Sequence, residues 1–394
     1  MSDSDGLLNL IDDNEVIQLT REMVGIPSLT HHEGRGMATF LESWFRELNI
    51  PVRLYECPDD RANFFADYGA TSGPGRFLFN GHQDTKPVDG MTVDPYGAEI
   101  RDGRMYGRGA CDMKGAVAGI LCAFKALVRA GVKPKGGITF FSDIEEEFSG
   151  PDGFLSIIDK GLVDGYEGVI SGEPTKLEIH IGNMGSIATA FEVRGKAAHA
   201  SMPHLGVNAI HHAARFITEY LKLPYSRENN PYFGMPTINF ERIEAGKYFE
   251  ATVPDRCLIC IDSRLIPETP PERVWKEYEE LAERLKRDED IDVRVVDPPK
   301  AWRPRSGQAT AAYIPADHPL TQRVIEAYTD ATGRDPVIAA LPGATFAGVM
   351  IRRGTPSIIC GPGSIEQAHT EDEWVEIAQL PEAARIYTRL MAAM

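Results

Sequence analysis

Apolar residues in the first part of the chain form short unbroken runs and longer stretches with helical spacing. Residues 77–79 and 137–142 are short runs that predict buried strands, and residues 115–130 are long enough for a buried helix. An amphipathic helix is predicted by a stripe that consists of Met37, Phe40, Leu41, Trp44, Phe45 and Leu48. This alternation predicts an α/β fold, in which a mixed, mostly parallel sheet carries helices on both faces.

A second pattern occupies residues 185–298. Strands are predicted by alternating or β-branched positions at residues 187–193, 237–243, 256–264 and 292–296. Helices are predicted by apolar stripes at residues 207–221 and 274–285. The resulting order, β-α-β-β-α-β, is typical of a ferredoxin-like α+β domain.

Length and charge limit the classes of partner. With 394 residues and 43% hydrophobic content, the chain is long enough for about two domains with filled cores. Its 41 basic and 58 acidic residues give a net charge of −17, which argues against nucleic acid and anionic membranes as partners. No apolar stretch reaches the length of about 18 residues that a membrane span needs, and no secretion signal is evident. We therefore expect a cytoplasmic protein.

The six cysteines do not indicate a disulfide framework, because nothing in the sequence indicates secretion. The single CxxC pair, Cys257 and Cys260, lies in a predicted strand, where an offset of three places the two side chains on opposite faces. We interpret both as core thiols.

Candidate chemistry comes from imidazoles and carboxylates in five separate segments. They read FNGHQDT, GRGACDMKG, SDIEEEFSG, SGEPT and QAHTEDE, and they contain His82, Asp112, Glu146, Glu147, Glu173 and His369. Any one of these residues alone has an ordinary explanation as a packing or surface residue. Together they form a nitrogen and oxygen ligand set that suits zinc, and a bridging carboxylate would let two ions lie about 3.5–4 Å apart.

In this order and spacing, these segments resemble the superfamily of acetylornithine deacetylase, succinyl-diaminopimelate desuccinylase, carboxypeptidase G and the aminoacylases. The resemblance runs from Gly25-Ile26-Pro27-Ser28 to the segment around His369. It implies a zinc-peptidase-like catalytic domain at residues 1–184 and 299–394. It also implies that residues 185–298 are an inserted lid and dimerisation domain, so that the protein forms a homodimer.

The resemblance also implies the roles of single residues. His82 and Glu173 are expected to bind one zinc ion, His369 and Glu147 a second, and Asp112 both, with Co²⁺ or Mn²⁺ as alternative metals. Glu145 is then a flanking acid, although a slip of one position within the Glu145–Glu147 triplet stays open. The other expected roles are orientation of His82 by Asp84, base catalysis by Glu146, oxyanion stabilisation by His199 across the dimer, and substrate binding by Arg264, Gly361 and Gly363.

The expected reaction is hydrolysis of the amide C–N bond of an N-acyl amino acid or a related small amide, by zinc-activated water and a glutamate base. Three alternatives remain: a metallo-exopeptidase or carboxypeptidase, a hydrolase of non-peptide C–N bonds with one or two metals, and a non-catalytic binding protein. A base beside a full ligand set argues against the last. Thr252 and Phe346 stand where the superfamily often has Asn and Asp near the substrate, so the resemblance does not name the substrate.

Overall fold

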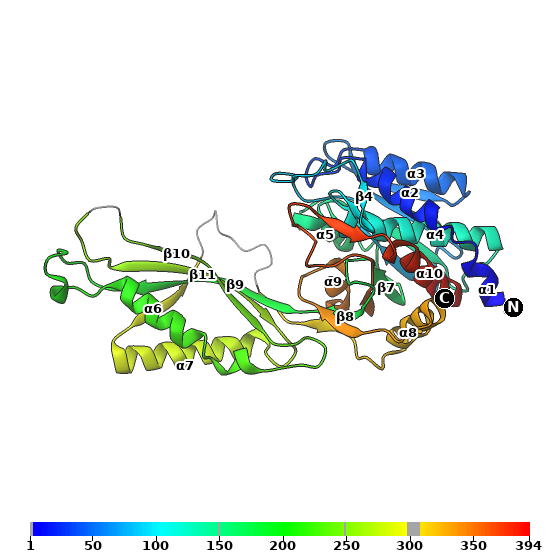
Figure 1. The fold of residues 1–394 in the computed structure, drawn as a ribbon. Coiled ribbons are helices and arrows are strands. Elements are labelled where there is room, and N and C mark those ends of the chain that lie inside the picture. The colour runs from blue at the N-terminus through cyan, green and yellow to red at the C-terminus, as the bar shows by residue number, and fades with distance from the viewer. Residues whose placement is uncertain (1–2, 149, 248–249, 298–307) are drawn as a thin grey trace. The chain divides into compact units, whose positions relative to one another are not determined.

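The computed structural model describes residues 3–148, 150–247, 250–297 and 308–394. The chain forms two compact units (Figure 1). The larger unit comprises Met1–Gly182, Tyr313–Leu341 and Thr345–Met394, and the inserted unit comprises Asn183–Ala312 and Pro342–Ala344.

A mixed sheet forms the centre of the larger unit, as the sequence predicts. Its strand order is β1-β2-β6-β3-β7-β16-β8-β14, and β15 also pairs with β8. The four central strands, from β6 to β16, are parallel to one another, whereas β1, β2 and β8 add antiparallel pairs at the flanks. The strands are β1 (Val52–Cys57), β2 (Arg61–Tyr68), β3 (Phe77–Asn80), β6 (Ile138–Ser142), β7 (Gly168–Ser171), β8 (Ile179–Asn183), β14 (Ala312–Tyr313), β15 (Ile338–Leu341) and β16 (Ser357–Ile359).

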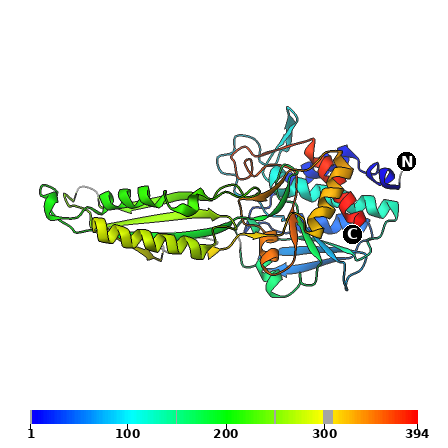
Figure 2. The same ribbon diagram turned by 90° about the horizontal axis from the view of Figure 1, so that it is seen from below.

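Helices cover both faces of this sheet (Figure 2). Successive strand residues point to opposite faces, so Phe64 and Phe140 pack in one hydrophobic cluster while Phe65 and Phe141 pack in another. The first cluster includes residues of α1 (Asp3–Leu8), α2 (Asp13–Val24), α3 (Gly36–Glu47), α4 (Gly115–Ala130), α8 (Pro319–Thr332) and α10 (Gln379–Ala393). The second includes residues of α5 (Phe154–Asp159) and α9 (Phe346–Arg352).

One detail of these layers differs from expectation, and a second explains how two helices pack closely. Phe346 is fully buried in the second cluster against the rings of Phe141 and Phe154, so its side chain is part of the core. Helix α4 is apolar on nearly every side, and Gly119 lets α10 approach it, since a Cβ there would lie 3.3 Å from the backbone nitrogen of Ala384. Both residues therefore contribute to the packing of the core.

A small antiparallel sheet joins distant parts of the larger unit. It consists of β4 (Glu99–Arg101), β5 (Arg104–Tyr106) and β17 (Trp374–Glu376), with Trp374 opposite Tyr106. The pairing fixes the segment that follows His369 beside the segment that precedes Asp112. These three-residue strands are too short to show a pattern of apolar residues in the sequence.

The inserted unit has the predicted β-α-β-β-α-β order. Its antiparallel sheet has the order β10-β11-β9-β12, and helices α6 and α7 cover one face of it (Figures 1 and 2). The elements are β9 (Gly185–Arg194), α6 (Ala209–Tyr220), β10 (Thr237–Ala245), β11 (Arg256–Leu265), α7 (Pro271–Glu289), β12 (Asp292–Val296) and the short β13 (Gln308–Ala309). Cys257 packs beneath the helices and Cys260 does not, and all six cysteines of the chain are free thiols.

Within the described parts of the chain, no helix combines the length and apolar character that crossing a membrane requires.

Candidate active site

Three neighbouring parallel strands present candidate ligands at one edge of the central sheet. His82 follows β3, Glu173 follows β7, and Glu146 and Glu147 lie on the short 3₁₀ turn Glu146–Phe148 that follows β6. Because β3 lies between β6 and β7, the carboxyl ends of all three strands meet at the same edge. This edge is where open α/β sheets place their binding sites.

Asp112 reaches the same edge from the turn before α4, and a buried carboxylate holds that turn. One oxygen of Glu373 accepts hydrogen bonds from the backbone N–H groups of Cys111 (2.8 Å) and Asp112 (3.0 Å). The other accepts from the backbone N–H of Gly109 (3.2 Å) and from the guanidinium of Arg108 (2.9 Å). Glu373 was not among the predicted site residues, and its only signal in the sequence is its position four residues after His369.

The carboxyl group of Asp112 lies between the two candidate imidazoles. Its Oδ1 is 2.9 Å from Nε2 of His82, and its Oδ2 is 3.4 Å from Nε2 of His369. His369 Nε2 is also 2.8 Å from Oε2 of Glu147. Two groups of three residues offer possible ligand atoms that lie within 4.8 Å of one another. One group is His82, Glu146 and Glu173, and the other is His82, Asp112 and Glu147. The structure thus brings all five predicted metal ligands and the predicted base into one cluster.

The burial of this cluster fits a cationic occupant. His82, Asp112, Glu147 and Glu173 are buried, and Oε1 of Glu173 has no hydrogen-bond partner. Burial, and then the neighbouring Asp112 carboxylate, raises the pKa of Glu173 to about 8. A buried carboxylate without a partner is costly, and a divalent ion would satisfy it. The nitrogen and oxygen donors suit zinc and similar ions.

The ring of His82 is oriented by a backbone group. Its Nδ1 lies 2.9 Å from the carbonyl oxygen of Asp84, which can only accept, so Nδ1 carries the proton and Nε2 is left to bind a metal. The Asp84 carboxylate is 3.6 Å from Nδ1 and accepts instead from the Thr30 hydroxyl and from the backbone N–H groups of Glu146 and Glu147. Asp84 therefore fixes both the His82 ring and the turn that carries the glutamates.

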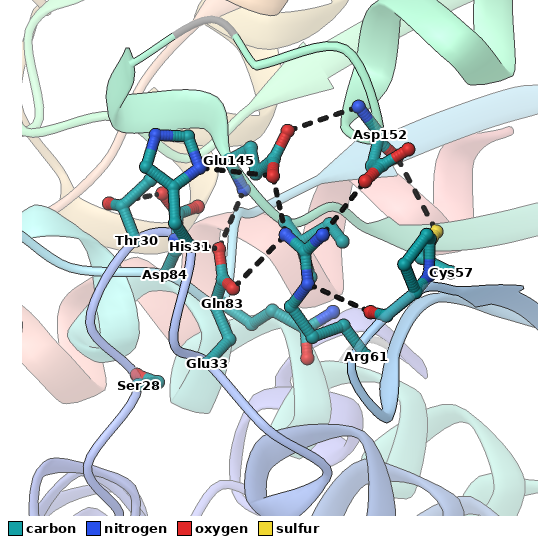
Figure 3. A network of polar contacts seen from close by, with 12 residues as sticks. Ser28, Thr30, His31, Glu33, Cys57, Arg61, Gln83, Asp84, Glu145 and Asp152 are labelled. Atoms are coloured by element: carbon teal, nitrogen blue, oxygen red, sulfur yellow. Dashed lines mark hydrogen bonds and ion pairs between the residues drawn. The ribbon is translucent and has the colours of Figure 1, made fainter.

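Glu145, the first member of the acidic triplet, is engaged elsewhere. Figure 3 shows the buried Arg61 guanidinium among the carboxylates of Glu145, Asp152 and Glu33. Asp152 lies 2.8 Å from this guanidinium, and Glu145 pairs with it as well. Nδ1 of His31 is also 3.0 Å from Glu145. These contacts hold the start of the glutamate turn, and they leave Glu146 and Glu147 to face the cluster.

Lys86 adds a positive charge to the cluster. Its ammonium nitrogen is 3.0 Å from Oε2 of Glu147, donates to the backbone oxygen of Glu147, and lies 4.3 Å from the centre of the Phe148 ring. Lys86 was not among the predicted site residues, because a lysine before a proline carries no signal of its own.

The two glycines predicted to bind substrate lie in a loop that packs against the ligand segments. A Cβ on Gly361 would lie 2.0 Å from the backbone oxygen of Gly172, beside Glu173. Gly363 has a φ of 86°, and a Cβ there would lie 2.6 Å from Sγ of Cys111. Both positions require glycine for close backbone approach, and their contact with substrate stays a prediction.

His199 and Arg264 lie in the inserted unit. Nδ1 of His199 accepts from the backbone N–H of Ser201 (3.2 Å), so the neutral ring carries its proton on Nε2. Arg264, on β11, pairs with Asp262 through Nε (2.9 Å) and Nη2 (3.1 Å). Their predicted roles toward substrate stay predictions.

Comparisons with known proteins agree with this geometry. Residues 78–393 match the model of peptidase family M20/M25/M40. An acetylornithine deacetylase of Myxococcus xanthus is 32% identical over 332 residues, which are 82% of this chain and 81% of that protein. A probable succinyl-diaminopimelate desuccinylase of Staphylococcus epidermidis is 26% identical over 93% of this chain and 95% of that protein.

Solved structures share the fold. The aminopeptidase PepT of Bacillus cereus has a TM-score of 0.76 at 23% identity, with 98% of this chain and 99% of that chain covered. The YXEP protein of Bacillus subtilis, described as a dinuclear metal binding peptidase of the M20 family, has a TM-score of 0.68 at 15% identity, with 96% and 97% covered.

Proposed function

The chain belongs to peptidase family M20/M25/M40 and is a metal-dependent hydrolase of amide bonds, and we propose that it removes the acyl group from small N-acyl amino acids with two zinc ions per subunit. The observation that carries this proposal is the Asp112 carboxyl group. One of its oxygens faces His82 and the other faces His369. A carboxylate in this position can bridge two ions.

His82 and Glu173 would hold one ion and His369 and Glu147 the other, with Asp112 shared between them. Two bound zinc ions would lower the pKa of a water molecule toward neutrality and polarise the substrate carbonyl. The ring orientation of His82 supports its part, since the carbonyl of Asp84 leaves Nε2 with its lone pair available.

Glu146 is the proposed general base. It lies within the group formed with His82 and Glu173, and its backbone N–H is held by Asp84. Burial, followed by the charge of Glu173, raises the pKa of Glu146 well above its usual range, which makes its carboxylate a stronger base toward a proton of water and its acid form able to return that proton to the leaving nitrogen. Such transfer typically contributes about 10²–10⁴-fold in rate.

A second copy of the chain is proposed to complete the site. The neutral His199 ring has an Nε2–H donor that suits the negative charge developing on a carbonyl oxygen, and the Arg264 fork suits a substrate carboxylate. Strand β10 is an edge strand with an exposed Ile243, which supports a homodimer built through the inserted unit. The free thiols support a cytoplasmic location.

Metal content and substrate range together test the proposal. Elemental analysis of the purified protein should give about two metal ions per chain, and release of free amine from a panel of N-acyl amino acids should stop when a chelator is added. Turnover of free-amine dipeptides alone would instead identify an exopeptidase. A single metal with turnover of ureido substrates would identify a hydrolase of non-peptide C–N bonds, and no metal even after zinc is added would identify a binding protein.

A further inference from the structure

The two groups of candidate ligands differ in the cations that surround them. Glu147 has the Lys86 ammonium 3.0 Å from the same oxygen, Oε2, that lies 2.8 Å from His369. Glu173 has no ion pair with a lysine or arginine among residues that the structure describes, and its Oε1 has no hydrogen-bond partner. The Oε1 atom of Glu173 is therefore available to a metal without a competing partner, whereas Oε2 of Glu147 already has a cationic neighbour.

Lys86 is held in this place by more than its charge. Its ammonium group also donates to the backbone oxygen of Glu147 and lies over the ring of Phe148, and its side chain is only 14% exposed. These contacts involve the backbone and a ring, so they do not depend on the Glu147 carboxylate. A fixed ammonium group would then repel a divalent ion that binds to Glu147, and partial burial limits the screening of that repulsion.

We propose that Lys86 makes the two metal sites unequal, so that the site of His369 and Glu147 binds zinc more weakly than the site of His82 and Glu173. The inference rests on the proposed two-metal function and deepens it. At limiting zinc the protein would hold one ion, and the second would bind only as the concentration rises. Lys86 acts on the metal through Glu147, so it is a positioning residue.

Zinc titration of the metal-free protein tests this directly. Isothermal titration calorimetry, with bound metal counted after equilibrium dialysis, should resolve two steps for the wild-type protein. In Lys86→Met, the dissociation constant of the second step should fall by at least about tenfold, because one unit charge beside the ion is removed. The first step should change by a smaller factor, because an ion held by His82 and Glu173 would lie farther from Lys86 and the repulsion falls with distance.

Three further variants separate charge from packing. Lys86→Arg keeps the charge and should retain the weak second step, and Lys86→Gln should behave like Lys86→Met. Lys133→Met removes an equal charge from an exposed turn before β6, at the opposite end of the strand from the ligands, and should match the wild type. Thermal melting of each variant reports whether it folds.

Distinct outcomes separate the two proposals. Two bound ions in the wild type with an unchanged second step in both Lys86→Met and Lys86→Gln would overturn the role of Lys86 alone. Equal tightening of both steps, or the same gain in Lys86→Arg, would overturn it as well. No bound zinc in any variant would overturn the two-metal function itself.

Discussion

Replacing Glu373 by glutamine should disturb the metal cluster without removing any ligand. Glu373 is almost fully buried and accepts four hydrogen bonds, from the guanidinium of Arg108 and from the backbone N–H groups of Gly109, Cys111 and Asp112. A glutamine keeps the shape of the side chain but has only one accepting oxygen. Its amide nitrogen therefore faces N–H donors on one side, and the buried Arg108 loses its counter-charge.

The size of the effect follows from that loss. Removing one partner of a buried ion pair costs about 3–5 kcal/mol, and each buried donor without a partner costs about 1–3 kcal/mol. These costs overlap, so we expect Glu373→Gln to lower the free energy of unfolding by about 3–5 kcal/mol. Because Asp112 is shared by both proposed zinc sites, Glu373→Gln should weaken both steps of a zinc titration. Lys86→Met, in contrast, should change mainly the second step.

Urea denaturation of the metal-free protein measures the first quantity, and calorimetric zinc titration measures the second. Glu371→Gln, two residues earlier and exposed, is the matched control and should change stability by less than about 0.5 kcal/mol. A loss below about 1 kcal/mol in Glu373→Gln, together with unchanged zinc affinity, would refute the idea that this carboxylate holds the Asp112 turn.

The remaining predictions concern catalysis, assembly and acid stability. Glu146→Gln should keep its zinc and lose turnover by at least about 10²-fold, as elemental analysis and an amine-release assay would show. Mixing inactive Glu146→Gln subunits with inactive His199→Ala subunits should restore part of the activity, because each hybrid dimer contains one site that combines an intact base with an intact histidine. Arg264→Ala should raise KM for a substrate with a free carboxylate but not for its amidated analogue. Hydrogen bonds from Lys222, and then from Arg284, lower the pKa of Glu219 to about 2. The stabilising contribution of Glu219 is therefore complete above about pH 4.5 and is lost as the pH falls toward 2. Glu219→Gln should remove that part of the acid dependence of stability, as measured by thermal melting.

Each of these outcomes has a clear opposite. Loss of zinc in Glu146→Gln would show that the acidic triplet is misaligned by one residue. No recovery on mixing would count against a site shared between subunits, and equal loss for amidated and free substrates would remove the carboxylate role of Arg264. An unchanged acid transition in Glu219→Gln would show that its ion pairs add no stability.

Strong periodicity made much of the fold predictable. The buried helix at residues 115–130 and the β-α-β-β-α-β order of the inserted unit are both present, because their apolar patterns extend over whole elements. The three-residue strands of the small sheet escaped prediction, since such short segments carry no period. The parallel centre followed from alternating strands and helices, whereas the antiparallel flanks depend on pairing that the local pattern does not encode.

The candidate ligands were found because each lies in a distinctive short segment. The residues that hold those segments in place were not found, because they are far in sequence from the segments that they contact. Glu373 is 261 residues from Asp112, and Arg61 is 84 residues from Glu145. A carboxylate or guanidinium in such a place looks like any surface charge until tertiary packing buries it. Short local segments therefore identify the candidate metal ligands. The residues that hold these ligands in place become evident only from long-range packing.

The distance between Asp112 and Glu373 also has a consequence for biosynthesis. At a synthesis rate of about 5–20 residues per second, 261 intervening residues take on the order of ten to fifty seconds to emerge. While residues 172–356 are being synthesised, β7 lacks its parallel neighbour β16 and presents an unpaired apolar edge. The nascent chain is thus unable to assemble the proposed hydrolytic centre until translation nears completion, and the exposed edge of the incomplete sheet is where we expect chaperones to bind.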